Sequence, residues 1–185
     1  MLLFTVVTGL VYPLVVTGLC QILFRQRANG SLAMRDGKVV GSHLIAQNFQ
    51  SPDYFHPRPS AAGDGYDPTA SGPSNLGPTN QALVTRVDQA AAAFHKANPE
   101  APAELPADLL TTSASGLDPD ISPASAADQA ARVAAARQVP VGAIRALVAK
   151  LIQQPQWGFL GEARVNVLDL NLALDQEFSR KAISR

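Results

Sequence analysis

The chain contains a single cysteine, and it lies within an uncharged stretch near the N-terminus. Cys20 has no partner for a disulfide within the chain, and the remaining sequence offers no thiolate for catalysis or metal binding. Aromatic residues make up only 6% of the sequence, so we expect a modest core rich in alanine. Lysine plus arginine equals aspartate plus glutamate at 15 each, so no net field attracts nucleic acid, and we expect none to bind.

The familiar signatures of catalytic and nucleotide-binding sites are also missing. The sequence has no Gly-Lys-Ser or Gly-Lys-Thr phosphate loop, no dinucleotide fingerprint, no HExxH and no CxxC. His43, His56 and His95 are scattered without the spacing of metal ligands. Asp118 and Asp120 are spaced like the start of a calcium loop, but its glycine and closing glutamate are absent, so we interpret them as turn and capping residues. We therefore expect this chain alone to bind no metal and no cofactor.

The most informative stretch runs from Leu2 to Phe24 without a single charge. A helix of this length, rising about 1.5 Å per residue, crosses a hydrocarbon core of roughly 30 Å. The alternatives are a cleaved signal peptide, whose apolar region usually spans about 7–15 residues, and a lipoprotein signal. Neither fits well, because the run is too long and Leu19 stands where a lipoprotein signal has a small residue. The sequence predicts a transmembrane anchor over residues 1–25 and a soluble domain over residues 26–185.

Several residues of the predicted anchor are unusual for a helix that only faces lipid. Pro13 lies mid-segment, where it removes a backbone donor and is expected to kink the helix. Gly9 and Gly18 allow another helix to approach closely, so we predict that the anchor packs against partner helices through these three residues. Arg25 and Arg27 follow directly, and the positive-inside tendency alone would place the soluble domain in the cytosol.

The soluble domain is predicted to be of the α/β class, α+β in type, with a hairpin, a long ordered loop and about three helices. Asp36-Gly37 lies between two short extended runs, which predicts a two-residue hairpin turn. Apolar spacing and capping residues indicate the helices. They are expected over residues 80–97, with Leu83, Val87, Ala90, Ala91 and Phe94 on one face; over 123–137, with Ala126, Ala130 and Val133 inward; and from Pro140 to just before Pro155. A short strand is expected over residues 108–113, and the tail is interpreted as a strand over 164–168 followed by a helical turn, with a helix capped by Asn166 as the alternative.

Residues 51–80 hold six prolines and four glycines, which excludes a long helix or a central strand. A disordered linker is one interpretation. Tyr54, Phe55, Tyr66 and Leu76 argue against it, because disordered segments usually lack such apolar residues. We expect an ordered loop packed on the domain, of the kind that contacts a partner or a ligand.

Five runs of sequence, in order along nearly the whole chain, resemble one known family. They are YFHPRPSA (54–61), YDPTASGPSNLGPTN (66–80), SASGLDPDISPASA (113–126), ARVAAAR (131–137) and GEARVNVLDLNLALD (161–175). On these runs the chain resembles the C subunit of the potassium-transporting Kdp ATPase, KdpC. It departs from the usual family pattern at Ala46, Pro73 and Gln138, where glycine is usual, and at Ala163, where proline is usual.

The resemblance implies a non-catalytic, single-pass subunit of a high-affinity, ATP-driven potassium uptake complex in the bacterial inner membrane. The implied partners are a channel-like, potassium-selecting subunit (KdpA), a P-type ATP-hydrolysing subunit (KdpB), the small KdpF subunit and membrane lipid, with ATP and K+ handled by the complex. The family is also described as a catalytic chaperone that raises the ATP affinity of the hydrolysing subunit.

The resemblance also bears on which side of the membrane the domain lies. Family members usually begin several residues earlier with a basic residue, and such a leader would hold the N-terminus in the cytosol and place the soluble domain in the periplasm. An effect on ATP would then have to pass through the membrane helices. A direct nucleotide contact, through Gln129, would require the cytosolic orientation.

The loop SGPSNLGPTN (71–80) offers small polar groups to a potassium-selecting partner. The residues predicted to contact this partner are Ser71, Gly72, Ser74, Asn75 and Asn80, with negative potential added by Asp118. The alternative is that these residues only fix the loop and cap the following helix. The rival function is a membrane-anchored envelope hydrolase that uses Asp118, Asp120 and a histidine.

Overall fold

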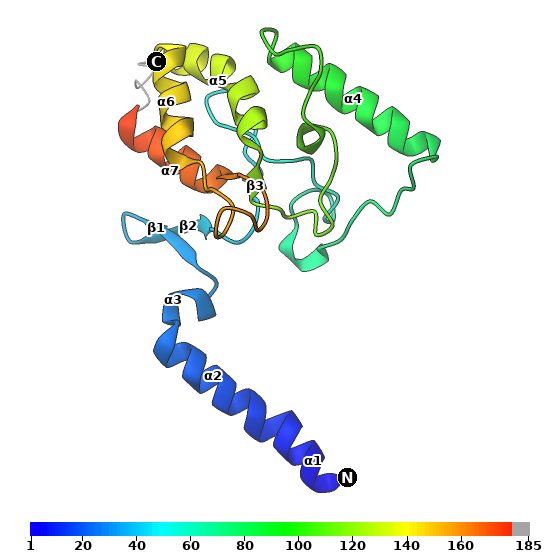
Figure 1. The fold of residues 1–185 in the computed structure, drawn as a ribbon, viewed down its shortest axis with the longest axis vertical. Coiled ribbons are helices and arrows are strands. Elements are labelled where there is room, and N and C mark those ends of the chain that lie inside the picture. Colours follow the sequence, from blue (N-terminus) through cyan, green and yellow to red (C-terminus); the bar gives the residue numbers. More distant parts are fainter. Residues whose placement is uncertain (179–185) are drawn as a thin grey trace. The chain divides into compact units, whose positions relative to one another are not determined.

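The computed structural model describes residues 1–178, which form two compact units (Figure 1). The first unit is Met1–Leu44 and the second begins at Ile45. The fold is mixed, as predicted, with an apolar N-terminal helix, two small antiparallel sheets and several further helices. The predicted hairpin falls within the first unit, and residues 179–185 of the predicted soluble domain lie outside the described residues.

The first unit begins with one long apolar helix. It consists of α1 (Leu2–Val6), a π-helical turn η1 (Val7–Val11) and α2 (Tyr12–Leu23), and a short helix α3 (Arg25–Ala28) follows. The span Leu2–Leu23 is long and apolar enough to cross a membrane, and its side chains are not buried within the described chain. This helix fits a single-pass membrane protein.

The π-helical turn lies directly before Pro13 and contains Gly9. A proline has no N–H to donate, and its ring pushes away the carbonyl four residues earlier, which here belongs to Gly9. A π-helical turn widens the backbone around that carbonyl. The irregularity expected at Pro13 therefore takes the form of a π-helical turn.

A hairpin closes the first unit. Strands β1 (Leu32–Arg35) and β2 (Lys38–Ser42) pair antiparallel, with a bulge between Ala33 and Met34. Asp36 and Gly37 have φ values of +52° and +75°, the conformation that a two-residue turn of this kind requires. The predicted hairpin and its turn are confirmed.

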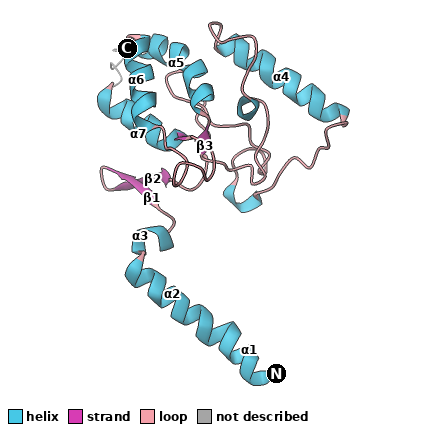
Figure 2. Cartoon of the chain, in the orientation of Figure 1, coloured by secondary structure: helices cyan, strands magenta, loops and turns pink. Residues whose placement is uncertain are grey.

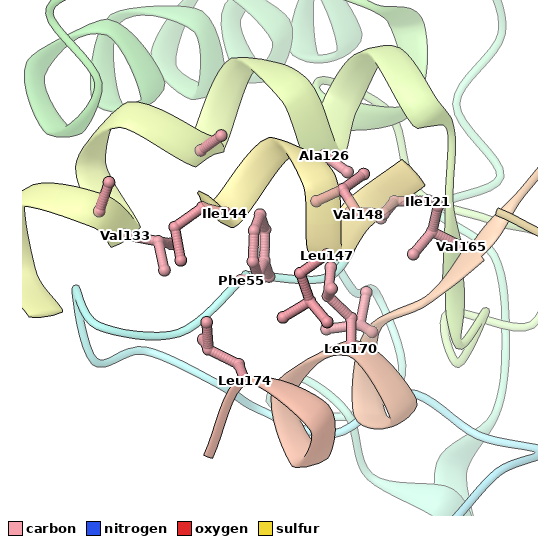
Figure 3. Packing of buried hydrophobic residues seen from close by; sticks show 13 residues of the cluster. Phe55, Ile121, Ala126, Val133, Ile144, Leu147, Val148, Val165, Leu170 and Leu174 are labelled. Carbon is pink, nitrogen blue, oxygen red and sulfur yellow. The ribbon is translucent and has the colours of Figure 1, made fainter. Parts of the chain in front are cut away.

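Three helices form the core of the second unit: α5 (Pro123–Arg137), α6 (Val141–Leu151) and α7 (Val167–Glu177). The predicted inward residues of α5, Ala126, Ala130 and Val133, are fully buried. Figure 3 shows Phe55, from the long loop, among the buried side chains of these helices, and it is 0% exposed. The core is thus small and alanine-rich, and a loop residue completes it.

Strands contribute little to this unit, as Figure 2 shows. β3 (Asp120–Ile121) and β4 (Val165–Asn166) pair antiparallel over two residues each. β3 lies just before α5 and β4 just before α7, so this short sheet holds the starts of the two helices together.

Helix α5 ends at Gln138, whose φ of +57° lies in the left-handed region. Glycine is favoured there, because a side chain in this conformation costs about 1 kcal/mol. This is one of the positions where the sequence departs from the glycine usual in the resembled family. The departure therefore changes the residue and keeps the backbone turn.

Helix α4 (Gln81–Ala97) starts at Asn80, whose side chain accepts a hydrogen bond from the Ala82 N–H. The five apolar residues predicted on one face of this helix are half-buried, and no residue of the helix is fully buried. The helix, its cap and its inner face are confirmed, but α4 contributes little to the core.

Two predicted elements are corrected. The strand expected over residues 108–113 is wrong: a 3-10 turn, η3 (Ala107–Leu109), stands there, and the Asp108 carboxylate accepts hydrogen bonds from the N–H and hydroxyl of Ser122 at the start of α5. In the tail the strand is confined to Val165–Asn166, and the Asn166 side chain caps the full-length helix α7. Leu168, Leu170, Leu172 and Leu174, whose alternation in the sequence is also typical of a strand, all belong to this helix.

The long loop is ordered, as predicted, and one part of it is held in an unusual way. Residues 52–56, the clamped segment, lie against α5 and α7 without belonging to a strand. The Asn171 side chain accepts from the Phe55 N–H and donates to the Phe55 carbonyl, both at 2.9 Å. The Gln129 side chain does the same for His56, at 2.8 and 3.1 Å. These two side-chain amides thus form the backbone hydrogen bonds that a neighbouring strand would form in a sheet.

Two arginines of α5 hold the remaining carbonyls of the clamped segment. Arg132 Nη1 donates to the carbonyls of Pro52 at 2.6 Å and Tyr54 at 2.9 Å. Arg137 Nε donates to the Asp53 carbonyl at 2.8 Å, and its guanidinium lies 5.0 Å from the centre of the Tyr54 ring. The five consecutive carbonyls of this segment therefore all bond to side chains of α5 or α7.

Replacing Asn171 with alanine tests this arrangement, because it leaves the buried N–H and C=O of Phe55 unpaired. We expect Asn171→Ala to lower the free energy of unfolding by roughly 2–4 kcal/mol. Denaturant unfolding of the full chain in detergent micelles, followed by circular dichroism, measures the change. Gln176→Ala, at an exposed position of the same helix, is the control and should stay within about 0.5 kcal/mol of the parent. An equal effect of the two substitutions would contradict the proposed clamp.

Candidate partner-contact site

Two loops of the second unit pack side by side and bring several predicted site residues together. These paired loops comprise residues 58–72 and 113–120. The Ser71 hydroxyl and the Gly72 N–H both donate to the Ser115 carbonyl at 2.9 Å. The Ser60 hydroxyl donates to the Gly116 carbonyl at 2.7 Å. Ser71 and Gly72, which come from the predicted contact loop, thus lie next to the loop that carries Asp118.

Gly116 permits this close packing. Its φ is +68°, and a Cβ added there would lie 2.7 Å from the Ala62 nitrogen and 2.9 Å from the Gly72 carbonyl oxygen. Both neighbours are backbone atoms, which cannot move aside as a flexible side chain can. Glycine is therefore required here both by the backbone conformation and by the space.

A charged cavity of about 550 Å³ opens beside the paired loops. Its charged lining residues are Arg58, Asp108, Asp118, Asp120, Glu162 and Arg164. Arg58 forms an ion pair with Asp118 at 2.8 Å, and Arg164 forms one with Asp120 at 3.0 Å. The negative potential expected from Asp118 is thus offset by a neighbouring guanidinium, so the cavity wall offers both signs of charge.

Burial raises the pKa values of two groups at or near this cavity, Asp120 and Tyr66. Burial raises the pKa of the Asp120 carboxyl above its usual value, and the adjacent Arg164 guanidinium offsets part of that rise. On the loop behind Arg58, burial raises the pKa of Tyr66 to about 12, and its hydroxyl donates to the Arg58 carbonyl at 2.8 Å. Tyr66 therefore stays protonated and fixes the backbone that carries Arg58.

Arg58 also presents an unused donor. Its Nε is buried and forms no hydrogen bond with the described residues. Arg58 and Arg164 were not singled out from the sequence, although both lie in runs that carry the family resemblance. Only the fold pairs them with Asp118 and Asp120.

The other residues of the predicted contact loop have different roles. Asn80 caps α4. The side chains of Ser74 and Asn75 form no hydrogen bonds with residues 1–178, and Asn75 is exposed with a φ of +54°. Part of the loop therefore fixes local structure, while Ser74 and Asn75 stay free to contact a partner.

Gln129 lies elsewhere, in the core. It is 0% exposed, and its amide bonds to the backbone of His56 and to the Arg132 guanidinium. A contact of Gln129 with a nucleotide stays a prediction, and it would require breaking these bonds. In the membrane span, a Cβ at Gly9 or Gly18 would meet nothing within 4 Å, so both leave room for another helix, and helix packing at these residues and Pro13 also stays a prediction.

The geometry does not support the rival hydrolase. No histidine of the described chain lines the cavity that holds Asp118 and Asp120. His56 belongs to the clamped segment, with its Nε2 3.0 Å from the Ser51 carbonyl oxygen, and burial, together with the charge of Arg132, lowers its pKa. Within residues 1–178 no group of three or more His, Cys, Asp or Glu side chains could hold a metal ion.

Gly116→Ala tests the packing of the paired loops. The new methyl group meets two backbone atoms in a conformation that disfavours it, so we expect a loss of roughly 2 kcal/mol or more in the free energy of unfolding. Hydrogen exchange of residues 60–72 should accelerate in the same variant. Gly142→Ala in α6 is the control, because its Cβ meets nothing within 4 Å and alanine favours a helix by about 1 kcal/mol. If the two variants were equally stable, the role given to Gly116 would be wrong.

The family model described as "K+-transporting ATPase, c chain" (KdpC) matches residues 1–176. A potassium-transporting ATPase KdpC subunit from Caulobacter vibrioides is 57% identical over 177 residues, which cover 95% of this chain and 89% of the relative. The corresponding protein of Rhodospirillum rubrum is 56% identical over 174 residues (94% and 90%), and that of Beijerinckia indica is 53% identical over 178 residues (96% and 90%). Since the match takes in both the apolar helix and the second unit, the chain belongs to the KdpC family, the c chain of K+-transporting ATPases.

Proposed function

We propose that this chain is a non-catalytic, single-pass subunit of an ATP-driven potassium uptake complex and is needed for the assembly of that complex. The observation that carries the proposal is the family match over residues 1–176, which spans the apolar helix and the second unit together. The ion pairs of Asp118 and Asp120 with arginines also favour a binding role over hydrolysis. Potassium selection and ATP hydrolysis then belong to the channel-like and P-type subunits.

The proposed contact with the channel-like subunit comprises the paired loops, the residues 73–75 that follow the first of them, and the cavity beside the loops. Two features support it: the side chains of Ser74 and Asn75, which form no hydrogen bonds with residues 1–178, and a cavity wall that offers both signs of charge. A partner segment with complementary charges would satisfy these groups and fix the register of the two proteins. The loops behind the surface are rigid, because Gly116 and Ser115 bind them to each other.

The proposed orientation places the second unit in the periplasm and the helix Leu2–Leu23 in the inner membrane. A chaperone effect on ATP affinity must then cross the bilayer as a coupling free energy between subunits. The π-helical turn at Val7–Val11 and the open positions Gly9 and Gly18 are the features of the span through which neighbouring helices would sense this chain.

Assembly of the complex tests the proposed contact. Omitting this chain should abolish the assembly or the potassium-stimulated ATP hydrolysis of the remaining subunits. The double variant Ser74→Ala/Asn75→Gly should weaken binding of the chain to them by roughly tenfold, as loss of a partner contact of about 1.4 kcal/mol requires. Affinity purification of the complex at graded concentrations measures this.

The substitutions are chosen to leave the domain intact. Glycine removes the Asn75 side chain and tolerates its positive φ, whereas alanine would add strain. Gln89→Ala, at an exposed position of α4, is the matched control and should bind normally. Unchanged assembly in the double variant would refute the contact, and full coupling without the chain would refute the function.

Labelling of introduced cysteines tests the orientation. Cys20 is the only natural cysteine and lies in the span, so Ala124→Cys and Ala136→Cys each add one exposed thiol to α5. A membrane-impermeant maleimide should label both variants in spheroplasts and leave the parent unlabelled. Labelling that appears only after lysis would place the second unit in the cytosol.

A further inference from the structure

An exposed aromatic tip projects from the segment between α6 and α7. Residues 153–164 form an irregular hairpin in which Gln153 pairs with Arg164 and Gln156 pairs with Leu160. At its end, Trp157, Phe159 and Leu160 are 83%, 72% and 45% exposed. These three residues, the aromatic tip, are the large apolar side chains of the second unit that stand together in solvent.

The tip is ordered. The Leu160 N–H donates to the Gln156 carbonyl at 2.9 Å, and the Gly158 N–H donates to the Pro155 carbonyl at 3.0 Å. The rings of Trp157 and Phe159 lie 6.4 Å apart, within the range of aromatic pairs. Trp157 itself has a φ of +53°, in the left-handed region that a tryptophan rarely occupies. The hairpin therefore holds a bulky apolar residue in solvent in a backbone conformation that disfavours it, which indicates a binding role.

The chemistry of the tip fits a lipid surface. Leu151 to Gly161 carries no charge, and the Trp157 indole N–H forms no hydrogen bond within the described chain. Tryptophan favours the boundary between acyl chains and headgroups, where the ring is in an apolar medium and the N–H meets polar groups. A protruding tip of two aromatic rings and a leucine also enters a fluid medium without needing a matching pocket.

Nearby positive charges and the membrane anchor of the chain also favour a lipid surface as the binding partner of the tip. Lys150 and Arg164, just before and at the base of the hairpin, pair with Glu177 and Asp120 but keep 66% and 45% of their side chains exposed, so both cations are also accessible to phosphate headgroups. The chain's own apolar helix keeps the second unit beside a bilayer at all times, so even a weak apolar contact is favoured by its high effective concentration.

We propose that the aromatic tip inserts into the interfacial layer of the membrane that holds the chain's own helix. The second unit then has two attachments to the bilayer, one covalent and one through Trp157, Phe159 and Leu160. This inference rests on the single-pass attachment of the chain and is independent of the partner contact at the paired loops.

Trp157 is the only tryptophan of the chain, so its fluorescence reports on the tip alone. The full chain is incorporated into nanodiscs of phosphatidylcholine and phosphatidylglycerol, with acyl chains brominated at shallow or deep positions. We expect a blue-shifted emission and a loss of intensity that is greater with the shallow bromines. Emission as in water without quenching would overturn the proposal, and so would a blue shift that appears only when partner subunits are added, because the tip would then bind protein.

Matched variants exclude general contact of the domain with lipid. In Trp157→Phe/Val84→Trp the tryptophan moves to an exposed position of α4, where we expect no quenching; quenching equal to that of the parent would overturn the proposal. Phe159→Ser/Leu160→Ser should reduce quenching of Trp157 while circular dichroism stays unchanged. Elution of every variant with the nanodisc shows that the helix is inserted, so loss of tip binding is distinguishable from loss of the anchor.

Discussion

The second unit depends on how residues 52–56 satisfy their backbone. Phe55 is fully buried outside any sheet, so leaving its N–H and carbonyl unpaired would cost roughly 1–3 kcal/mol for each group, out of a total stability of about 5–15 kcal/mol. Here α5 and α7 supply the partners, with Asn171 and Gln129 each binding both backbone groups of one residue. Because the segment is fixed in this way, Phe55 enters the core and Arg58 reaches Asp118. The core and the candidate contact site are therefore built by the same interaction.

The alanines of α5 make this possible. Ala126 and Ala130 are fully buried, and their small side chains let the loop and the neighbouring helices approach the helix axis closely. Long polar side chains on the same helix, Gln129 and Arg132, then reach across to the clamped segment. A helix that looks weakly hydrophobic in sequence thus serves as the scaffold for a loop.

The two units divide the work of a membrane subunit. The first supplies an apolar span with a π-helical turn and open glycines, and the second supplies a rigid, charged loop surface and a separate aromatic tip. A partner held at the loops and a bilayer held at the tip would together restrict the motion of the domain.

Local sequence determined the elements whose causes are local. The length and lack of charge of the apolar run are enough to predict its helix, and Asp36-Gly37 is enough to predict the hairpin turn. Asn80 and Ser122-Pro123 likewise mark the starts of α4 and α5. The tertiary structure decided the rest. Residues 107–109 form a turn in place of a strand, with the Asp108 carboxylate accepting hydrogen bonds from Ser122, and β3 exists only because Asp120 pairs with Asn166. Likewise, Gln129 is buried because it bonds to the distant His56 backbone, and Asp118 forms an ion pair because the distant Arg58 lies beside it. No local sequence pattern predicts either contact.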